Sequence, residues 1–229
     1  SVGGPHTISD EAISIYESLS RRYPDDTAVF LRLGRARVKV ARSLPTGATK
    51  RFELQAAIRD LNKALSCAPL DDLVDKNHWV YFEAPLQIGL CFWIVANFPD
   101  LPIEKRIEGL LLATTHTAAA IERELPKEDP DDFVKFIRLR AAGNVILYLG
   151  LLLREDYEIE HAEREIQANI AYLREESSWR IVKNQPRIID SILFAAASTG
   201  DFKLAREMAK LNVENFVKIM HERAISVEE

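Results

Sequence analysis

The sequence is poor in the residues that hold small secreted proteins together. It has only two cysteines, Cys67 and Cys91, and neither has a second thiol at the spacing of a metal site or redox motif. Nine glycines and ten prolines among 229 residues are too few for a low-complexity or disordered chain. Because disulfides are rare in reducing compartments, we expect both cysteines to be buried thiols of a cytoplasmic protein.

Signals for secretion or membrane insertion are also missing. The apolar run 86–98 has about 13 residues, whereas a membrane helix needs about 20. No basic segment followed by an apolar one marks a signal peptide. We therefore predict a fully buried central helix over 86–98, a flexible leader over 1–8 and no membrane-spanning segment.

The motifs of common enzyme classes are absent as well. The chain has no Gly-rich phosphate loop, no Gly-x-Ser-x-Gly turn and no Cys-x-x-Cys pair. Glu158 and His161 form half of a di-iron signature, which needs a second Glu-x-x-His. The carboxylates between 122 and 132 surround a loop, as solvated capping residues do. We predict no catalytic residue, metal or cofactor in this chain.

What the sequence does contain is helical periodicity. Hydrophobic residues make up 47% and charged residues 28% of the chain, and strand alternation is not found. The spacing predicts an all-α fold of about nine helices in antiparallel pairs. Their ranges are about 9–22, 27–44, 52–67, 85–97, 103–125, 132–153 and 157–175, followed by two helices that meet at a Gly200-Asp201 turn, the second ending near 222.

Two sets of residues recur at fixed offsets along this pattern. The first set is Phe30, Leu33, Gly34 and Arg37, and the second is Ala57, Leu61, Ala64 and Pro69. Ala12, Tyr16, Leu19 and Pro24 repeat the second set, and Leu139, Ala142, Gly143 and Ile146 repeat the first. Small alanines let two helices approach closely, and a glycine inside a helix marks a close backbone contact.

These offsets resemble the tetratricopeptide repeat (TPR) family, most specifically over 11–24, 27–69 and 186–212. The resemblance implies a right-handed α-α superhelix that forms a single domain over 9–229. Because 11–24 matches only the second helix of a repeat, we expect a fragment of a larger protein whose preceding helix is missing. Over 70–180 the match is weaker.

The charge is uneven. Between Leu31 and Lys63 nine basic and two acidic residues give a net charge of +7, whereas the whole chain carries -5. Arg32, Arg35, Lys39 and Arg42 are spaced by three, four and three residues, so they share one face of a helix. This stripe is either a solvated helix face or the wall of an anion-binding groove.

The family's inner, concave face supplies further candidate residues. The resemblance implies partner contacts at Arg35, Val38, Lys39 and Arg42, at Leu86, Leu90 and Trp93, and at Arg140, Asn144 and Tyr148. Arg140 and Asn144 resemble part of a carboxylate clamp, although Arg35 stands where the second clamp asparagine belongs. Leu90 and Trp93 are alternatively core residues.

We therefore expect a non-catalytic scaffold or regulatory domain that binds a protein or peptide, with a preference for acidic partners. One alternative is nucleic-acid or nucleotide binding through the basic stripe, which the acidic net charge and the lack of interleaved aromatics disfavour. Another is the sensor domain of a multidomain bacterial enzyme or transcription factor, which rests on analogy with other family members.

Overall fold

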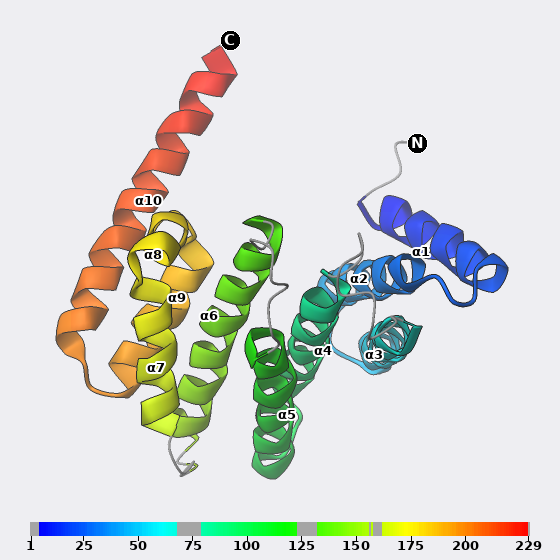
Figure 1. The fold of residues 1–229 in the computed structure, drawn as a ribbon, viewed down its shortest axis with the longest axis horizontal. Coiled ribbons are helices and arrows are strands. Elements are labelled where there is room, and N and C mark those ends of the chain that lie inside the picture. Colours follow the sequence, from blue (N-terminus) through cyan, green and yellow to red (C-terminus); the bar gives the residue numbers. More distant parts are fainter. Residues whose placement is uncertain (1–4, 68–78, 123–131, 156, 158–161, 229) are drawn as a thin grey trace. The chain divides into compact units, whose positions relative to one another are not determined.

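The structure, a computed structural model, describes residues 5–67, 79–122, 132–155, 157 and 162–228 (Figure 1). Within these residues every regular element is a helix, so the predicted all-α class is confirmed. The described residues form ten helices rather than the predicted nine. They divide into two compact units, 1–137 and 138–229, which are considered separately below.

The first unit contains five helices and the start of a sixth. They are α1 (Pro5–Arg22), α2 (Thr27–Ser43), α3 (Ala48–Cys67), α4 (Val80–Ala96) and α5 (Ile103–Glu122). Asp26 caps α2 as predicted, because its side chain accepts a hydrogen bond from the Val29 backbone nitrogen at 3.0 Å. α4 begins at Val80, so Pro85 lies inside the helix and not in its first turn.

The helices of this unit pack in chain order. Each of α1 to α4 packs against the helix that follows it, and α2 also packs against α4. The predicted close contact at Gly34 is confirmed, because a Cβ there would lie 2.6 Å from the Leu61 Cγ of α3. Gly89 of α4 repeats this arrangement on α5, where a Cβ would lie 2.8 Å from the Ala113 carbonyl oxygen. Gly89 lies within 70–180, where the repeat pattern is weak, so this contact was not predicted.

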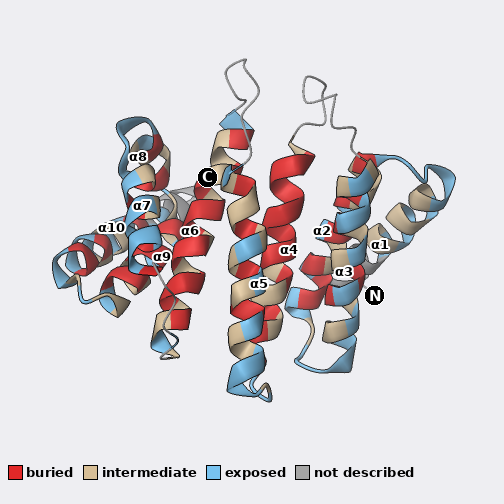
Figure 2. Ribbon diagram, turned by 60° about the horizontal axis from the view of Figure 1, so that its bottom comes forward, coloured by how far each residue is buried: buried red, intermediate tan, exposed pale blue. Residues whose placement is uncertain are grey.

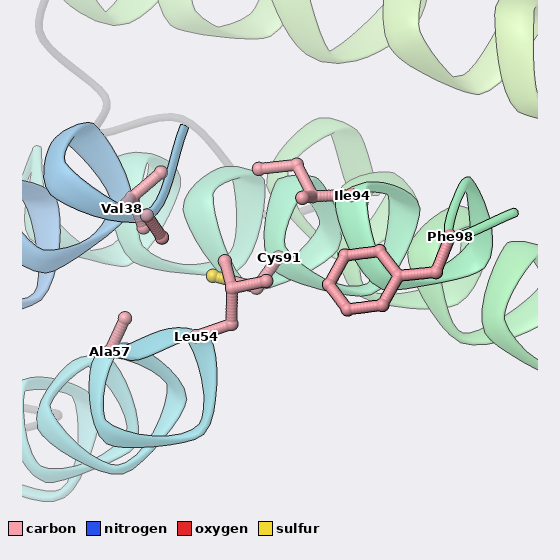
Figure 3. Packing of buried hydrophobic residues seen from close by; sticks show 7 residues of the cluster. Val38, Leu54, Ala57, Cys91, Ile94 and Phe98 are labelled. Carbon is pink, nitrogen blue, oxygen red and sulfur yellow. The ribbon is translucent and has the colours of Figure 1, made fainter. Parts of the chain in front are cut away.

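The core of the first unit centres on α4, which is buried nearly all round along its first turns (Figure 2). Figure 3 shows how Val38 of α2 and Leu54 of α3 surround Cys91 of α4, with Ile94 and Phe98 beside them. The apolar run 86–98 was predicted to be fully buried, but the structure buries only part of it: Leu90, Phe92, Trp93 and Val95 are partly covered and Asn97 is exposed. Burial of apolar side chains of this size contributes about 1.5–3 kcal/mol each.

The two cysteines differ. Cys91 is fully buried, as expected, whereas Cys67 at the end of α3 is only partly buried, which corrects that prediction. The two are not joined by a disulfide.

The second unit contains most of α6 (Asp132–Arg154), which starts in the first unit, and four further helices. These are α7 (Ala162–Arg174), α8 (Glu176–Val182), α9 (Pro186–Ser198) and α10 (Phe202–Glu228). α8 is the helix that the sequence analysis missed, because seven residues show barely two helical turns of periodicity. At the predicted turn, Gly200 has a φ of 78° and the Asp201 carboxylate caps α10.

Two glycines of α6 lie against α9. A Cβ on Gly143 would lie 3.2 Å from the Ile188 side chain of α9, and one on Gly150 would lie 3.2 Å from that of Phe194. In the described part of the chain, α6 is the one helix whose length and hydropathy would suffice to cross a membrane, which the sequence analysis did not notice. Because 61% of its most apolar window is buried inside the protein, α6 has the properties of a core helix.

Candidate binding surface on helix α2

The candidate surface is built on the exposed side of α2. Arg32, Arg35, Lys39 and Arg42 are all exposed, and we call these four residues the basic stripe. The opposite sides of α2 are apolar and pack against α1, α3 and α4. Because the apolar residues hold α2 in place, the stripe is presented by a helix that cannot rotate without losing its core contacts.

Three members of the basic stripe have no ion-pair partner among the described residues. These are Arg32, Lys39 and Arg42. The fourth, Arg35, has its Nε 3.7 Å from the Glu83 Oε1 of α4, and its side chain remains 46% exposed. Four positive charges on one helix face with a single opposing carboxylate repel one another, and an anion bound there would relieve that repulsion.

Glu83 is the polar residue that the sequence analysis missed. Its side chain is 1% exposed, and Gln87 donates a hydrogen bond to its Oε1 at 2.6 Å. The Glu83 Oε2 accepts no hydrogen bond from any described residue. A signal for Glu83 was present, because it is the single charged residue between Trp79 and Phe98. A lone carboxylate in so apolar a segment needs a charged or polar partner from another helix.

Arg37 also lies on α2 but has a different role. Its guanidinium contacts the Glu17 carboxylate of α1, and it donates to Glu53 and Asp60 of α3 at 2.9 Å each. Burial opposes the positive charge of Arg37, but the hydrogen bonds and attraction of the three carboxylates outweigh it and raise its pKa. Arg37 therefore ties α1, α2 and α3 together and is not available to a partner.

The remaining predicted residues of the first unit are less exposed. Val38 is 3% and Leu86 1% exposed, so both belong to the core and we leave them out of the proposed surface. Leu90 and Trp93 are partly buried and pack against the cluster that contains Val38. They lie on α4, the helix that also carries Glu83.

The candidate clamp residues lie in the second unit. Arg140 and Asn144 are both partly buried and stand one turn apart on α6. Tyr148, one turn further along, is 1% exposed and therefore lies in the core. Arg140 and Tyr148 each have an interaction within the protein. We restrict the candidate surface to the first unit for these reasons.

No group of three or more His, Cys, Asp or Glu residues in the described ranges is arranged to hold a metal ion. Burial raises the pKa of Cys91 to about 12, so its thiol stays protonated and is a poor nucleophile at neutral pH. The Glu158–His161 motif and most of the carboxylates around 122–132 lie outside the described residues.

Comparisons with known proteins add no identity. No protein-family model, no curated protein and no solved structure matches this chain.

Proposed function

We propose that this chain is a non-catalytic binding module, a TPR-like α-solenoid that recognises an acidic segment of a protein. The order of packing supports the solenoid in the first unit, since α2 contacts both its own partner α3 and the next first helix, α4. The glycine contacts support it too, because Gly34 on α3 and Gly89 on α5 place the same kind of close approach in consecutive helix pairs.

The basic stripe carries the functional part of the proposal. Four exposed cations lie on one face of α2, and three of them have no ion-pair partner among the described residues. The adjacent Arg37 contrasts with them, because three carboxylates neutralise it. The stripe thus retains a surplus of positive charge, and that surplus favours an anionic partner.

An acidic segment would bind the stripe through charge-assisted hydrogen bonds. Arginine guanidinium groups bind carboxylates in a bidentate manner, and Lys39 adds a further positive charge. The partly exposed surfaces of Leu90 and Trp93 would contact apolar side chains of the same segment. Because all four stripe residues are exposed, the electrostatic attraction is screened by salt.

The test is a fluorescence-anisotropy titration of the protein with a labelled peptide of about ten glutamates at low salt. The triple variant Arg35→Glu, Lys39→Glu and Arg42→Glu is expected to weaken binding at least about tenfold, because attraction becomes repulsion. Glu83→Gln is expected to tighten binding several-fold, because the carboxylate that opposes Arg35 is then neutral.

The matched control reverses three exposed cations of the second unit, Arg164→Glu, Lys183→Glu and Arg187→Glu. It changes the net charge by the same amount, so it separates an effect of the stripe from one of total charge. If both triple variants weaken binding equally, or if neither does, the stripe is not the binding surface. A labelled single-stranded RNA that binds more tightly than the peptide, with the same sensitivity to the stripe variant, would favour nucleic-acid binding instead.

A further inference from the structure

The second unit carries another exposed surface, on α10, and this surface is apolar rather than charged. Helix α10 exposes five large hydrophobic side chains by half or more: Phe202 (74%), Val213 (62%), Phe216 (64%), Val217 (60%) and Met220 (51%). From Val213 to Met220 their spacing is three, one and three residues, and Phe202 lies on the same face about three turns earlier. We call these five residues the apolar stripe.

The apolar stripe is not the face of α10 that packs against the rest of the second unit. Leu204, Ala205 and Met208 of α10 are buried, and this side packs against α9. The two apolar faces point in different directions around the helix, since residues three or four apart share a face and the two sets are out of phase. α10 is also the longest helix of the second unit (Figure 1).

A groove runs beside the apolar stripe, between α9 and α10. It has a volume of about 530 Å³ and is lined mainly by apolar side chains, namely Pro186, Leu193, Ala209, Val213, Phe216 and Ile219. Its two polar residues, Asp190 and Asn212, form a hydrogen bond with each other. Because their side chains satisfy one another, an apolar side chain can enter this groove at little polar desolvation cost.

We propose that a second copy of this chain covers the apolar stripe, with the two α10 helices packed antiparallel about a two-fold axis. The five side chains and Ile219 together expose about 600 Å² of apolar surface, as much as the largest patch of a typical monomer, with the exposed Arg206 on the same face between Phe202 and Val213. A symmetric pair would bury about 1,200 Å², which reaches the lower bound of stable interfaces. An isologous interface brings the same surface of both copies together, so the stripe of one copy would face the stripe of the other.

The charges of α10 favour the antiparallel direction. By sequence, residues 202–213 carry three basic and one acidic residue, a net of +2. Residues 214–228 carry three acidic and two basic residues, a net of -1. An antiparallel pair places unlike halves together and opposes the two helix dipoles, whereas a parallel pair places like halves together. In the antiparallel pair, side chains of one copy's stripe would occupy the α9–α10 groove of the other.

Sedimentation equilibrium of the full chain tests the proposal. At about 100 µM protein we expect twice the mass of the 26.0 kDa chain, since an interface of this size commonly gives micromolar affinity or better. Phe216→Glu is expected to return the mass to that of one chain. The matched control Phe52→Glu changes another exposed phenylalanine, at 58%, on α3, and is expected to leave the dimer intact.

Three outcomes would overturn the proposal. The first is a wild-type chain that stays monomeric at this concentration, and the second is a Phe216→Glu variant that still dimerises. The third is an assembly larger than a dimer, which a closed two-fold pair does not form. Circular dichroism of Phe216→Glu at the wild-type level shows that the loss of mass is not a loss of fold.

The direction of packing is tested by spin labels at Lys203→Cys in a Cys67→Ser background, in which the remaining Cys91 is buried. Position 203 lies 12 residues from residue 215, the midpoint of α10, so two labels in an antiparallel pair are about 36 Å apart. In a parallel pair they are about 10–15 Å apart, the width of two packed helices. The short distance would overturn the antiparallel arrangement.

Discussion

At the scale of single residues, neighbouring cations on α2 have different roles, because carboxylates of other helices pair with some of them and not with others. Arg37 is surrounded by carboxylates from α1 and α3, whereas Lys39 and Arg42 have no ion-pair partner among the described residues. The sequence places all of these residues on one helix and predicts the stripe, but Glu17 is 20 residues from Arg37 and carries no sequence signal for that contact. Glu83, likewise, is tied to Arg35 only by packing.

The cluster around Arg37 predicts a particular pH dependence of stability. Burial raises the pKa of Asp60, and the nearby Glu17 carboxylate adds to this although Arg37 opposes it. The folded state therefore binds a proton on Asp60 more tightly than the unfolded chain does. That contribution to stability is complete below the unfolded pKa and is lost as the pH rises through the folded value.

Asp60→Asn keeps residue 60 neutral at every pH, because asparagine resembles the protonated acid in shape and charge. The variant therefore does not lose stability at this position as the pH rises. We expect the variant to match the wild type near pH 3.5 and to gain free energy of unfolding relative to it as the pH rises toward 6, as measured by urea unfolding. Asp100→Asn, at an exposed site paired with Arg51, is the control and is expected to show no such trend. A variant that becomes less stable than wild type with rising pH would show that the Arg37 ion pair dominates.

At the scale of helices, glycines decide how closely the pairs approach. The repeat-like spacing predicts a close contact at Gly34, and the structure shows that the contact is with Leu61 of α3. Gly89 could not be predicted in the same way, because 70–180 departs from the repeat pattern and Thr117 stands where Leu61 stands in the earlier pair. α8 and the start of α4 were mispredicted because a short helix and an internal proline carry weak or misleading local signals.

Gly34→Ala is expected to destabilise the chain by up to about 2 kcal/mol, since overpacking costs about 1–3 kcal/mol and alanine's helix propensity returns about 1. Gly89→Ala is expected to cost more, because its added Cβ would lie 2.8 Å from a backbone oxygen.

In a double-mutant cycle, Gly34→Ala with Leu61→Ala should cost less than the sum of the single changes, because the new methyl group enters space that Leu61 vacates. Strict additivity in urea unfolding would mean that the two residues do not crowd each other.

At the scale of the whole molecule, two units each carry a candidate surface of different chemistry. The boundary between them falls inside α6, at 137–138, where the sequence has no Gly, Pro or Ser-rich linker. Sequence signals for domain boundaries are compositional, so this boundary could not be predicted, and the single continuous domain over 9–229 stays a prediction. The charge asymmetry was visible in the sequence, whereas the apolar stripe was not, because α10 is amphipathic on two sides and only packing shows which side is covered.

Because one surface is electrostatic and the other apolar, salt is expected to weaken peptide binding but not dimerisation. Raising NaCl from about 50 to 500 mM shortens the screening length to a few ångströms, so binding of the oligo-glutamate peptide should weaken about tenfold or more. The dimer mass should not fall, since salt does not weaken apolar burial.

The surfaces are also expected to act independently, because they lie on different units and share no residue. Phe216→Glu should therefore bind the peptide with wild-type affinity as a monomer, and the triple variant of Arg35, Lys39 and Arg42 should still dimerise without binding the peptide. Anisotropy and sedimentation measured on the same samples decide this. If Phe216→Glu loses peptide binding, the acidic segment needs both copies, and the binding site belongs to the dimer rather than to α2 of a single chain.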